Sequence, residues 1–154
     1  LTDIKDLFFA PELQDSVTFK VVAARAPEIE GAPIEFEAWG KETEKRSLLS
    51  FDVGIMPLRD DMWSRGKCGL KLIQYMASGI PSLTHPYGAA AEIIADGQDG
   101  LLRPDVTGWI EAIRMLATDP ALRDRLGINA RTTVEKRYSL QRWGKEIAGL
   151  MDRL

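Results

Sequence analysis

The sequence predicts an α/β domain of the Rossmann-like kind, in which helices cover both faces of a parallel sheet and the C-terminus is wholly helical. Segments of strand character alternate with helical segments through most of the chain, which is typical of an open parallel sheet. The strand expected at 53–58 is almost entirely apolar, as in a sheet covered on both faces. From residue 106 onward only helical patterns follow.

The first elements alternate in the order that this fold requires. Apolar residues recur at helical spacing over 1–8, and Pro11 closes that segment. β-Branched residues predict a buried strand at 17–24, and alternating apolar and acidic residues predict a strand with one solvated face at 34–38. The later elements expected are helices at 42–50, 69–78, 88–95, 106–118, 120–137 and 140–154, and strands at 53–58, 82–84 and 101–102.

Local signals mark where the later helices begin and end. Gly79 and Pro81 terminate the helix at 69–78. Asp119 supplies an N-cap, and Pro120 stands in the first turn of the helix that follows.

Composition bounds the size and chemistry of the protein. Its 154 residues are 45% hydrophobic and 28% charged, which suits one domain, 1–154, with a buried core. A net charge of −3 without a block of one sign argues against a nucleic-acid partner, and no apolar run approaches the ~20 residues of a membrane span. The single Cys68 and single His85 exclude a disulfide and a metal site built from several such residues. We therefore expect a cytoplasmic protein without a metal or cofactor.

The loop at 59–69 combines features of an anion-binding site. It carries the cations Arg59, Arg65 and Lys67, and two glycines stand just before a helix. A helix N-terminus presents unpaired backbone amides and the positive end of the helix dipole, and glycines let a phosphate approach them. The spacing is not that of a P-loop, because neither Ser nor Thr follows Lys67. A solvated basic turn is the alternative.

The helix behind this loop carries one polar stripe on otherwise apolar faces. Such a helix is expected to be largely buried, with its polar stripe toward water, another chain or a ligand cleft. Lys71 can reach a phosphate, and Gln74 offers a donor and an acceptor to the vicinal hydroxyls of a ribose. An ordinary amphipathic surface helix is the alternative. The polar stripe is Lys67, Lys71, Gln74 and Ser78, and the apolar stripe is Leu70, Ile73, Ala77 and Ile80.

A second glycine-led helix start follows the next strand, at 85–92. Because it lies at the same edge of the sheet, Gly88 can line the same crevice. Glu92 complements the helix dipole, and for His85 a structural role is at least as well supported as a role in the site. Asp52 opens its strand, whereas the phospho-acceptor aspartate of a response-regulator receiver ends one, so a receiver domain is not indicated.

Several blocks of the sequence form a longer pattern. They are SFDVGIMPL at 50–58, GLKLIQYMASGIP at 69–81, GAAAEI at 88–93, DGQDGLL at 96–102 and DPALR at 119–123. In order and spacing they resemble the C-terminal domain of family 4 glycosyltransferases, which are retaining enzymes of the GT-B fold. The resemblance covers about residues 15–145. Each block alone is a weak signal, and the resemblance rests on their occurring together in the same order and spacing.

The resemblance implies that this domain binds a nucleotide-diphosphate sugar. The family's two-glutamate motif falls on Gly66, near the donor sugar, and on Gln74, at the ribose, and both residues depart from it. Gln74 keeps hydrogen-bonding capacity without the charge, whereas Gly66 supplies no carboxylate. Gly88 is also expected near the sugar. The residues expected at the diphosphate are Arg65, Lys67, Cys68, Gly69, Leu70 and Lys71.

For the intact enzyme, the resemblance implies sugar transfer from a UDP-, GDP- or ADP-linked donor to a glycan, lipid or small-molecule acceptor, with retention and without a metal. The family's first strand of this domain and its N-terminal acceptor domain would precede Leu1, so the chain is expected to be a fragment that is inactive alone. Membrane association through the missing half stays open. No residue of the chain is indicated as a catalytic base or nucleophile.

A non-catalytic transferase-like module that binds a nucleotide or a protein is the alternative, and Gly66 and Gln74 support it. Such a module should expose an apolar patch at the strand ends, whereas a donor site should show a polar crevice. A Rossmann oxidoreductase is not indicated, because the glycine fingerprint followed ~20 residues later by an acidic residue is absent.

Overall fold

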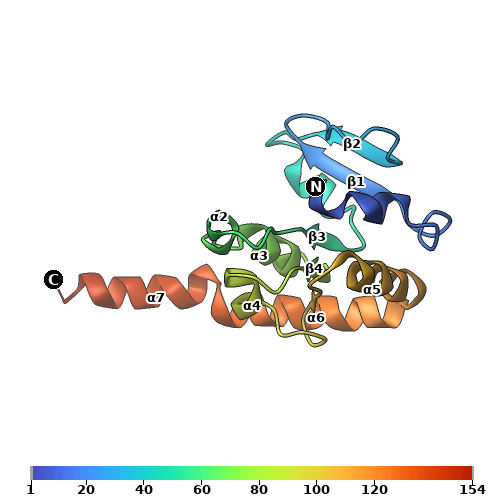
Figure 1. Cartoon of the computed structure of the whole chain (residues 1–154). Coiled ribbons are helices and arrows are strands. Elements are labelled where there is room, and N and C mark those ends of the chain that lie inside the picture. The colour runs from blue at the N-terminus through green and yellow to red at the C-terminus, as the bar shows by residue number, and fades with distance from the viewer. Residues whose placement is uncertain (1, 154) are drawn as a thin grey trace.

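The computed structural model describes residues 2–153 as parallel strands with covering helices, which confirms the predicted fold class (Figure 1). Three helices complete the chain, as the sequence predicts. The elements are η1 (Thr2–Phe9), β1 (Phe19–Ala23), β2 (Ile34–Ala38), α1 (Glu44–Leu48), β3 (Gly54–Met56), α2 (Met62–Arg65), α3 (Leu70–Ala77), β4 (Ser82–Thr84), α4 (Ala89–Ile93), β5 (Leu101–Leu102), α5 (Val106–Thr118), α6 (Pro120–Arg137) and α7 (Leu140–Met151).

The strands form two parallel sheets, where the sequence predicts one. β1 pairs with β2 along its whole length, from Phe19 opposite Ile34 to Ala23 opposite Ala38. β4 lies between β3 and β5 in the second sheet, and both neighbours run parallel to it. Within residues 2–153, no strand connects β1 to β3. Figure 1 shows β1 and β2 as a separate layer above β3 and β4.

Two clusters of buried apolar side chains hold these elements together. The first joins η1, α5 and the strands β4 and β5, and its Leu83 and Trp109 are fully buried. The indole N–H of Trp109 donates to the carbonyl oxygen of Arg103 at 3.0 Å, so this buried polar atom is satisfied. The second cluster lies between α3, α4 and α6 and includes Leu72 and Met76.

Helix α6 packs closely behind α3. A Cβ atom at Gly127 would lie 2.1 Å from the carbonyl oxygen of Gly79, so only glycine allows the two backbones to come this near. Arg131 of α6 also donates a hydrogen bond to the carbonyl of Ala77, the last residue of α3, at 3.0 Å. These contacts fix the C-terminal end of α3 and hence its direction.

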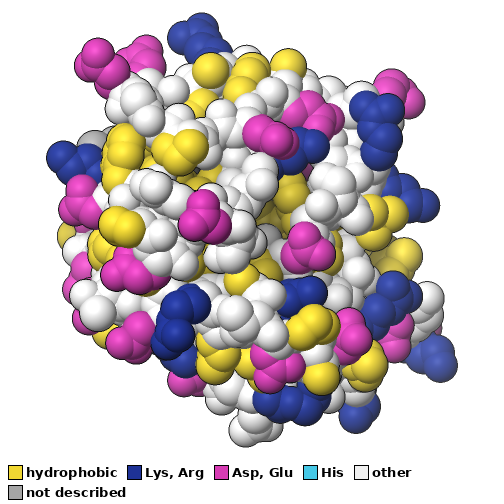
Figure 2. Space-filling model, turned by 90° about the vertical axis from the view of Figure 1, so that its right-hand side faces the viewer, with side chains coloured by type: hydrophobic (Ala, Val, Ile, Leu, Met, Phe, Trp, Pro, Cys, Tyr) yellow, Lys and Arg dark blue, Asp and Glu magenta, His cyan; other side chains and the backbone are white. Residues whose placement is uncertain are grey.

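Several elements differ from the predicted ones at their ends. The N-terminal helix is a 3₁₀ helix with a kink at Ile4, and α1 and α4 are shorter than expected. Helix α7 has no buried residue and extends away from the body of the molecule (Figure 1). Among the described helices, none has the length and apolar character needed to cross a membrane. The face in Figure 2 carries acidic and basic side chains interspersed.

Candidate functional site

The connection from β3 to α3 contains one turn of helix, α2, where the sequence predicted only a loop. The Asp61 carboxylate caps this turn by accepting a hydrogen bond from the Ser64 amide at 2.6 Å. That bond lowers the pKa of the Asp61 carboxyl and keeps it ionised. Ser64 is buried beneath the turn. The turn is therefore anchored, and it holds the residues that lead into α3.

Two glycines bring this connection against the loop between β4 and α4. A Cβ atom at Gly88 would lie 2.4 Å from the carbonyl oxygen of Arg65. Gly69 has φ +71° at the start of α3, and a Cβ there would lie 2.4 Å from Cδ1 of Ile93. Both positions require glycine, by sterics and by backbone conformation. The connection from β3 to α3 and the start of α4 therefore pack directly against each other.

The guanidinium of Arg65 has two partners beside the start of α4. It forms an ion pair with Asp60, with Nε at 2.7 Å and Nη2 at 2.5 Å from Oδ1. Its Cζ also lies 5.8 Å from the centroid of the Tyr87 ring, within the range of a cation–π contact. Arg65 is thereby oriented, and part of its charge is balanced.

Helix α3 differs from the helix that the sequence predicts. It begins at Leu70, so Lys67 lies before it and shares no helical stripe with Lys71. Its buried residues are Leu72, Tyr75 and Met76, whereas Leu70 of the predicted apolar stripe is 59% exposed. Leu72 and Met76 pack in the cluster shared with α4 and α6, and the Tyr75 ring packs against Gly54 of β3. Leu70 is free of that packing because it lies at the outer end.

The position of Gly66 can accept a side chain, whereas the positions of Gly69 and Gly88 require glycine. Its φ of −80° is open to any residue, and a Cβ atom would meet the Trp63 carbonyl oxygen at an ordinary 3.5 Å. Lys67 and Cys68 follow it as exposed residues, and Cys68 is a free thiol. Gly69 offers no side-chain cap to α3. The first turn of this eight-residue helix thus keeps the features of an anion site.

His85 has the contacts of a structural residue. Its ring is buried, and its Nδ1 accepts a hydrogen bond from the Leu58 amide at 3.1 Å. It stacks on Tyr87 with 5.6 Å between ring centroids, and Trp109 contacts it from another side. The ring therefore supports the strand ends. Throughout residues 2–153, no three His, Cys, Asp or Glu side chains gather as metal ligands.

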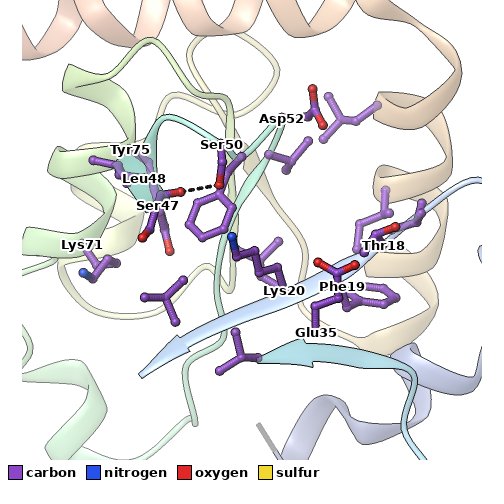
Figure 3. Close-up of a pocket in the computed structure, with 18 of the residues that line it drawn as sticks. Thr18, Phe19, Lys20, Glu35, Ser47, Leu48, Ser50, Asp52, Lys71 and Tyr75 are labelled. Carbon is purple, nitrogen blue, oxygen red and sulfur yellow. Dashed lines mark hydrogen bonds between the residues drawn. The ribbon is translucent and has the colours of Figure 1, made fainter. Parts of the chain in front are cut away.

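A cavity of about 740 Å³ lies between the two sheets. Lys71 and Gln74 line it from α3, and Lys20 lines it from β1. Figure 3 shows Lys71 and Tyr75 on one side of this space and β1 on another. Burial raises the pKa of Tyr75, so its hydroxyl stays protonated. Lys71 and Gln74 therefore face the cavity between the sheets, whereas Arg65 and Lys67, which do not line it, belong to the connection that contains α2.

Sequence reasoning missed three residues of this region. Asp60 and Tyr87 are the partners of Arg65, and Trp63 projects from α2 with 82% of its surface exposed. No periodicity or motif marks them, because the contacts come from the folding of α2 and its packing on a distant loop.

Known proteins match the chain over most of its length. The family model described as glycosyl transferases, group 1, matches residues 7–119. Alpha-D-kanosaminyltransferase of Streptomyces kanamyceticus is 29% identical over 107 residues, which are 68% of this chain and 26% of that protein. Sucrose synthase of Denitrovibrio acetiphilus is 32% identical over 85 residues, which are 51% of this chain and 11% of that protein. The chain thus spans about a quarter or less of these relatives.

Solved structures share the fold. The Anabaena protein HepE in complex with UDP-glucose superposes with a TM-score of 0.77 and 17% sequence identity. The match covers 99% of this chain and 44% of the HepE chain. Sucrose-phosphate synthase of Thermosynechococcus elongatus gives a TM-score of 0.77 and 20% sequence identity. The match covers 98% of this chain and 42% of the synthase chain.

Proposed function

The chain belongs to the group 1 glycosyltransferases, and from this premise we propose that it is the donor-binding half of a retaining transferase. It would hold a UDP-, GDP- or ADP-linked sugar, and a second domain outside residues 1–154 would hold a glycan, lipid or small-molecule acceptor. The observation that carries this proposal is the start of α3, where Gly69 leaves the helix without a side-chain cap beside Lys67. The complex of HepE with UDP-glucose supports it, because that protein shares the fold.

In this proposal the donor diphosphate lies at the start of α3. The amides at Cys68, Gly69 and Leu70 would donate to its oxygens, and Arg65, Lys67 and Lys71 would supply positive charge. Negative charge grows on the diphosphate as the sugar departs, and groups already positioned there stabilise that charge. This role needs no metal, because helix amides and cations supply the electrostatic stabilisation.

The nucleoside and the sugar would lie on either side of the diphosphate. Gln74 is one turn beyond Lys71 and lines the same cavity, so its amide suits the ribose hydroxyls. The sugar would lie near Gly66 and Gly88, where the two loops meet. Gly66 leaves this place without a side chain, so sugar recognition would come from neighbouring groups. We assign no catalytic base in this half, and we expect the isolated chain to bind donor without turnover.

The test is an NMR titration of the chain with UDP, GDP and ADP. We expect saturable shifts with one nucleotide, confined to the amides of 67–74 and 88–92. Lys71→Gln should weaken that binding, whereas Lys145→Gln, which changes a lysine on the projecting α7, should leave it unchanged. Shifts that are spread over the whole chain, or that survive Lys71→Gln unaltered, would contradict this placement.

A second candidate is a module that binds a protein partner through the same face. Met62 and Trp63 of α2 favour it, because 89% and 82% of their surfaces are exposed. On this alternative, none of the three nucleotides would shift the amides of 67–74, and Trp63→Ala would abolish capture of the partner. Nucleotide binding that persists in Trp63→Ala supports the donor site.

A further inference from the structure

Strand β2 has one free edge, on the outside of the layer that it forms with β1 (Figure 1). The Trp39 amide donates to the carbonyl oxygen of Ala23 at 2.9 Å, so the peptide groups of Trp39 face β1. Because peptide groups alternate in direction along a strand, those of Phe36 and Ala38 face away from β1. Within residues 2–153, no strand pairs with these outward groups, which we call the open edge of β2.

The open edge lacks the usual protection of an edge strand. Natural sheets block their edges with proline, lysine or a β-bulge. β2 contains neither proline nor lysine, and its register with β1 is unbroken over all five residues. The Phe36 side chain is also 43% exposed. The edge therefore offers the unpaired peptide groups and the apolar surface that an added strand uses.

The surroundings of this edge are acidic. The segment 28–44 contains six glutamates and a single lysine, although the whole chain has a net charge of only −3. Within β2, Glu35 and Glu37 alternate with the apolar residues. Glu37 already pairs with Lys20 at 2.6 Å, whereas Glu35 is exposed. Glu35 should therefore contribute most of the attraction for a basic partner.

These charges argue against a second copy of the chain at the open edge. In an antiparallel pair of β2 strands centred on Phe36, Glu35 of each copy would lie opposite Glu37 of the other. Like charges in directly opposite positions destabilise a strand pair, whereas opposite charges stabilise it. The charge pattern therefore selects a strand that carries cations at the two positions facing Glu35 and Glu37.

We propose that the open edge of β2 is a docking site for an extended basic segment of a partner protein, which adds to the sheet as an antiparallel strand. Apolar residues alternate with lysine or arginine in this segment. Its central apolar residue exchanges two backbone hydrogen bonds with Phe36, and its two cations lie opposite Glu35 and Glu37. Antiparallel pairing is slightly more stable per residue than parallel pairing, which favours this direction.

The test uses the peptide acetyl-Val-Lys-Val-Lys-Val-amide as the probe. The readout is amide hydrogen exchange of the chain, followed by NMR. At saturating peptide we expect exchange at Phe36 and Ala38 to slow by about fivefold or more. The amides of Glu35 and Glu37 serve as internal references, because they face β1 and are already paired.

Two control peptides separate strand pairing from simple charge attraction. Acetyl-Val-Glu-Val-Glu-Val-amide reverses the charges and should give no slowing. Acetyl-Val-Lys-Pro-Lys-Val-amide keeps the charges but lacks the central N–H donor, and it should also give none. Unchanged exchange at Phe36 and Ala38 with the probe, or equal slowing with all three peptides, overturns the proposal.

Two variants of the chain test the role of the acidic side chains. Glu35→Lys should weaken the binding of the probe by about fivefold. Glu146→Lys makes the same change of charge on the projecting α7 and should leave the binding unchanged. Equal weakening in both variants contradicts the proposal, as does protection of Phe36 that grows with protein concentration without the probe, which would indicate a second copy. No nucleotide is added, so the result is independent of the proposed function.

Discussion

At the scale of single residues, the Arg65 guanidinium already interacts with two side chains of this protein. Asp60 holds two of its nitrogens, and Tyr87 lies against the guanidinium. The ion pair is exposed, so its contribution to stability is about 1 kcal/mol or less. The ion pair should weaken the binding of a phosphate by a similar free energy, because the Asp60 carboxylate competes with the phosphate for the N–H donors of Arg65.

Asp60→Asn is therefore expected to tighten the binding of UDP, GDP or ADP, whichever the chain prefers, by up to about fivefold. The free guanidinium can then donate to the diphosphate without losing a carboxylate partner. Isothermal titration calorimetry at low salt measures the Kd. Asp124→Asn, on the distant α6, is the control and should leave the Kd unchanged. Weaker binding in Asp60→Asn would mean that the ion pair holds Arg65 in its binding position.

Gly66 and Gly69 are three residues apart in the chain, but only the position of Gly69 requires glycine. Gly69→Ala is expected to destabilise the fold by about 1–3 kcal/mol, because φ is +71° and the Cβ would press on Ile93. Gly66→Ala should be neutral or stabilising by up to about 1 kcal/mol, since its φ of −80° suits alanine. Chemical denaturation of both variants measures the difference. Equal losses would show that the connection tolerates no side chain at either position.

At the scale of elements, one carboxylate links β1, β2 and α1. Oε2 of Glu37 lies 2.6 Å from Nζ of Lys20, and the Ser47 hydroxyl donates to Oε1 at 2.5 Å. The hydrogen bond from Lys20 first, and then that from Ser47, hold the pKa of the Glu37 carboxyl below its usual 4.5. Because the pKa of Glu37 is lower in the folded state than in the unfolded chain, its interactions stabilise the fold at pH values above the unfolded-state pKa. This stabilisation is lost as the pH falls through the folded-state pKa.

We therefore expect Glu37→Gln to lower the Tm at neutral pH and to lose this effect progressively below about pH 4.5. Once the pH falls below the lowered pKa of the folded state, the Glu37 carboxyl is protonated and resembles the amide. Thermal unfolding followed by circular dichroism across that range measures the two curves. Glu35→Gln, on the same strand, is the control. A Tm difference that stays constant down to pH 3 would contradict the ionic origin of the contribution.

At the scale of the whole molecule, α7 stands apart from the two core clusters. None of its residues is buried, and its Trp143 N–H donates to the carbonyl of Arg137 at 2.8 Å. Removing residues 140–154 is therefore expected to cost about 1 kcal/mol or less in unfolding free energy. Leu126→Ala in α6, a fully buried position, should cost about 2–5 kcal/mol. Urea denaturation compares the two, and a loss of similar size in both would show that α7 packs on the body in solution.

The fold class and most elements could be predicted because their signals are local. The apolar run at 53–58 and the Asp119–Pro120 helix start report strand and helix within a few residues. The glycine-led starts of α3 and α4 were visible for the same reason. Lengths were less accurate, since the ends of η1, α1 and α4 depend on packing that no local pattern records.

The sequence by itself determined the class of the protein, the order of its elements and the residue types that gather near α3. Only the tertiary structure decided that Gly88 rests on Arg65, that Asp60 binds that arginine, that Leu70 is exposed and that the sheet is divided. The reason is physical. Periodicity is imposed by neighbours along the chain, whereas a contact or a strand partner depends on which distant segment fills the adjacent space.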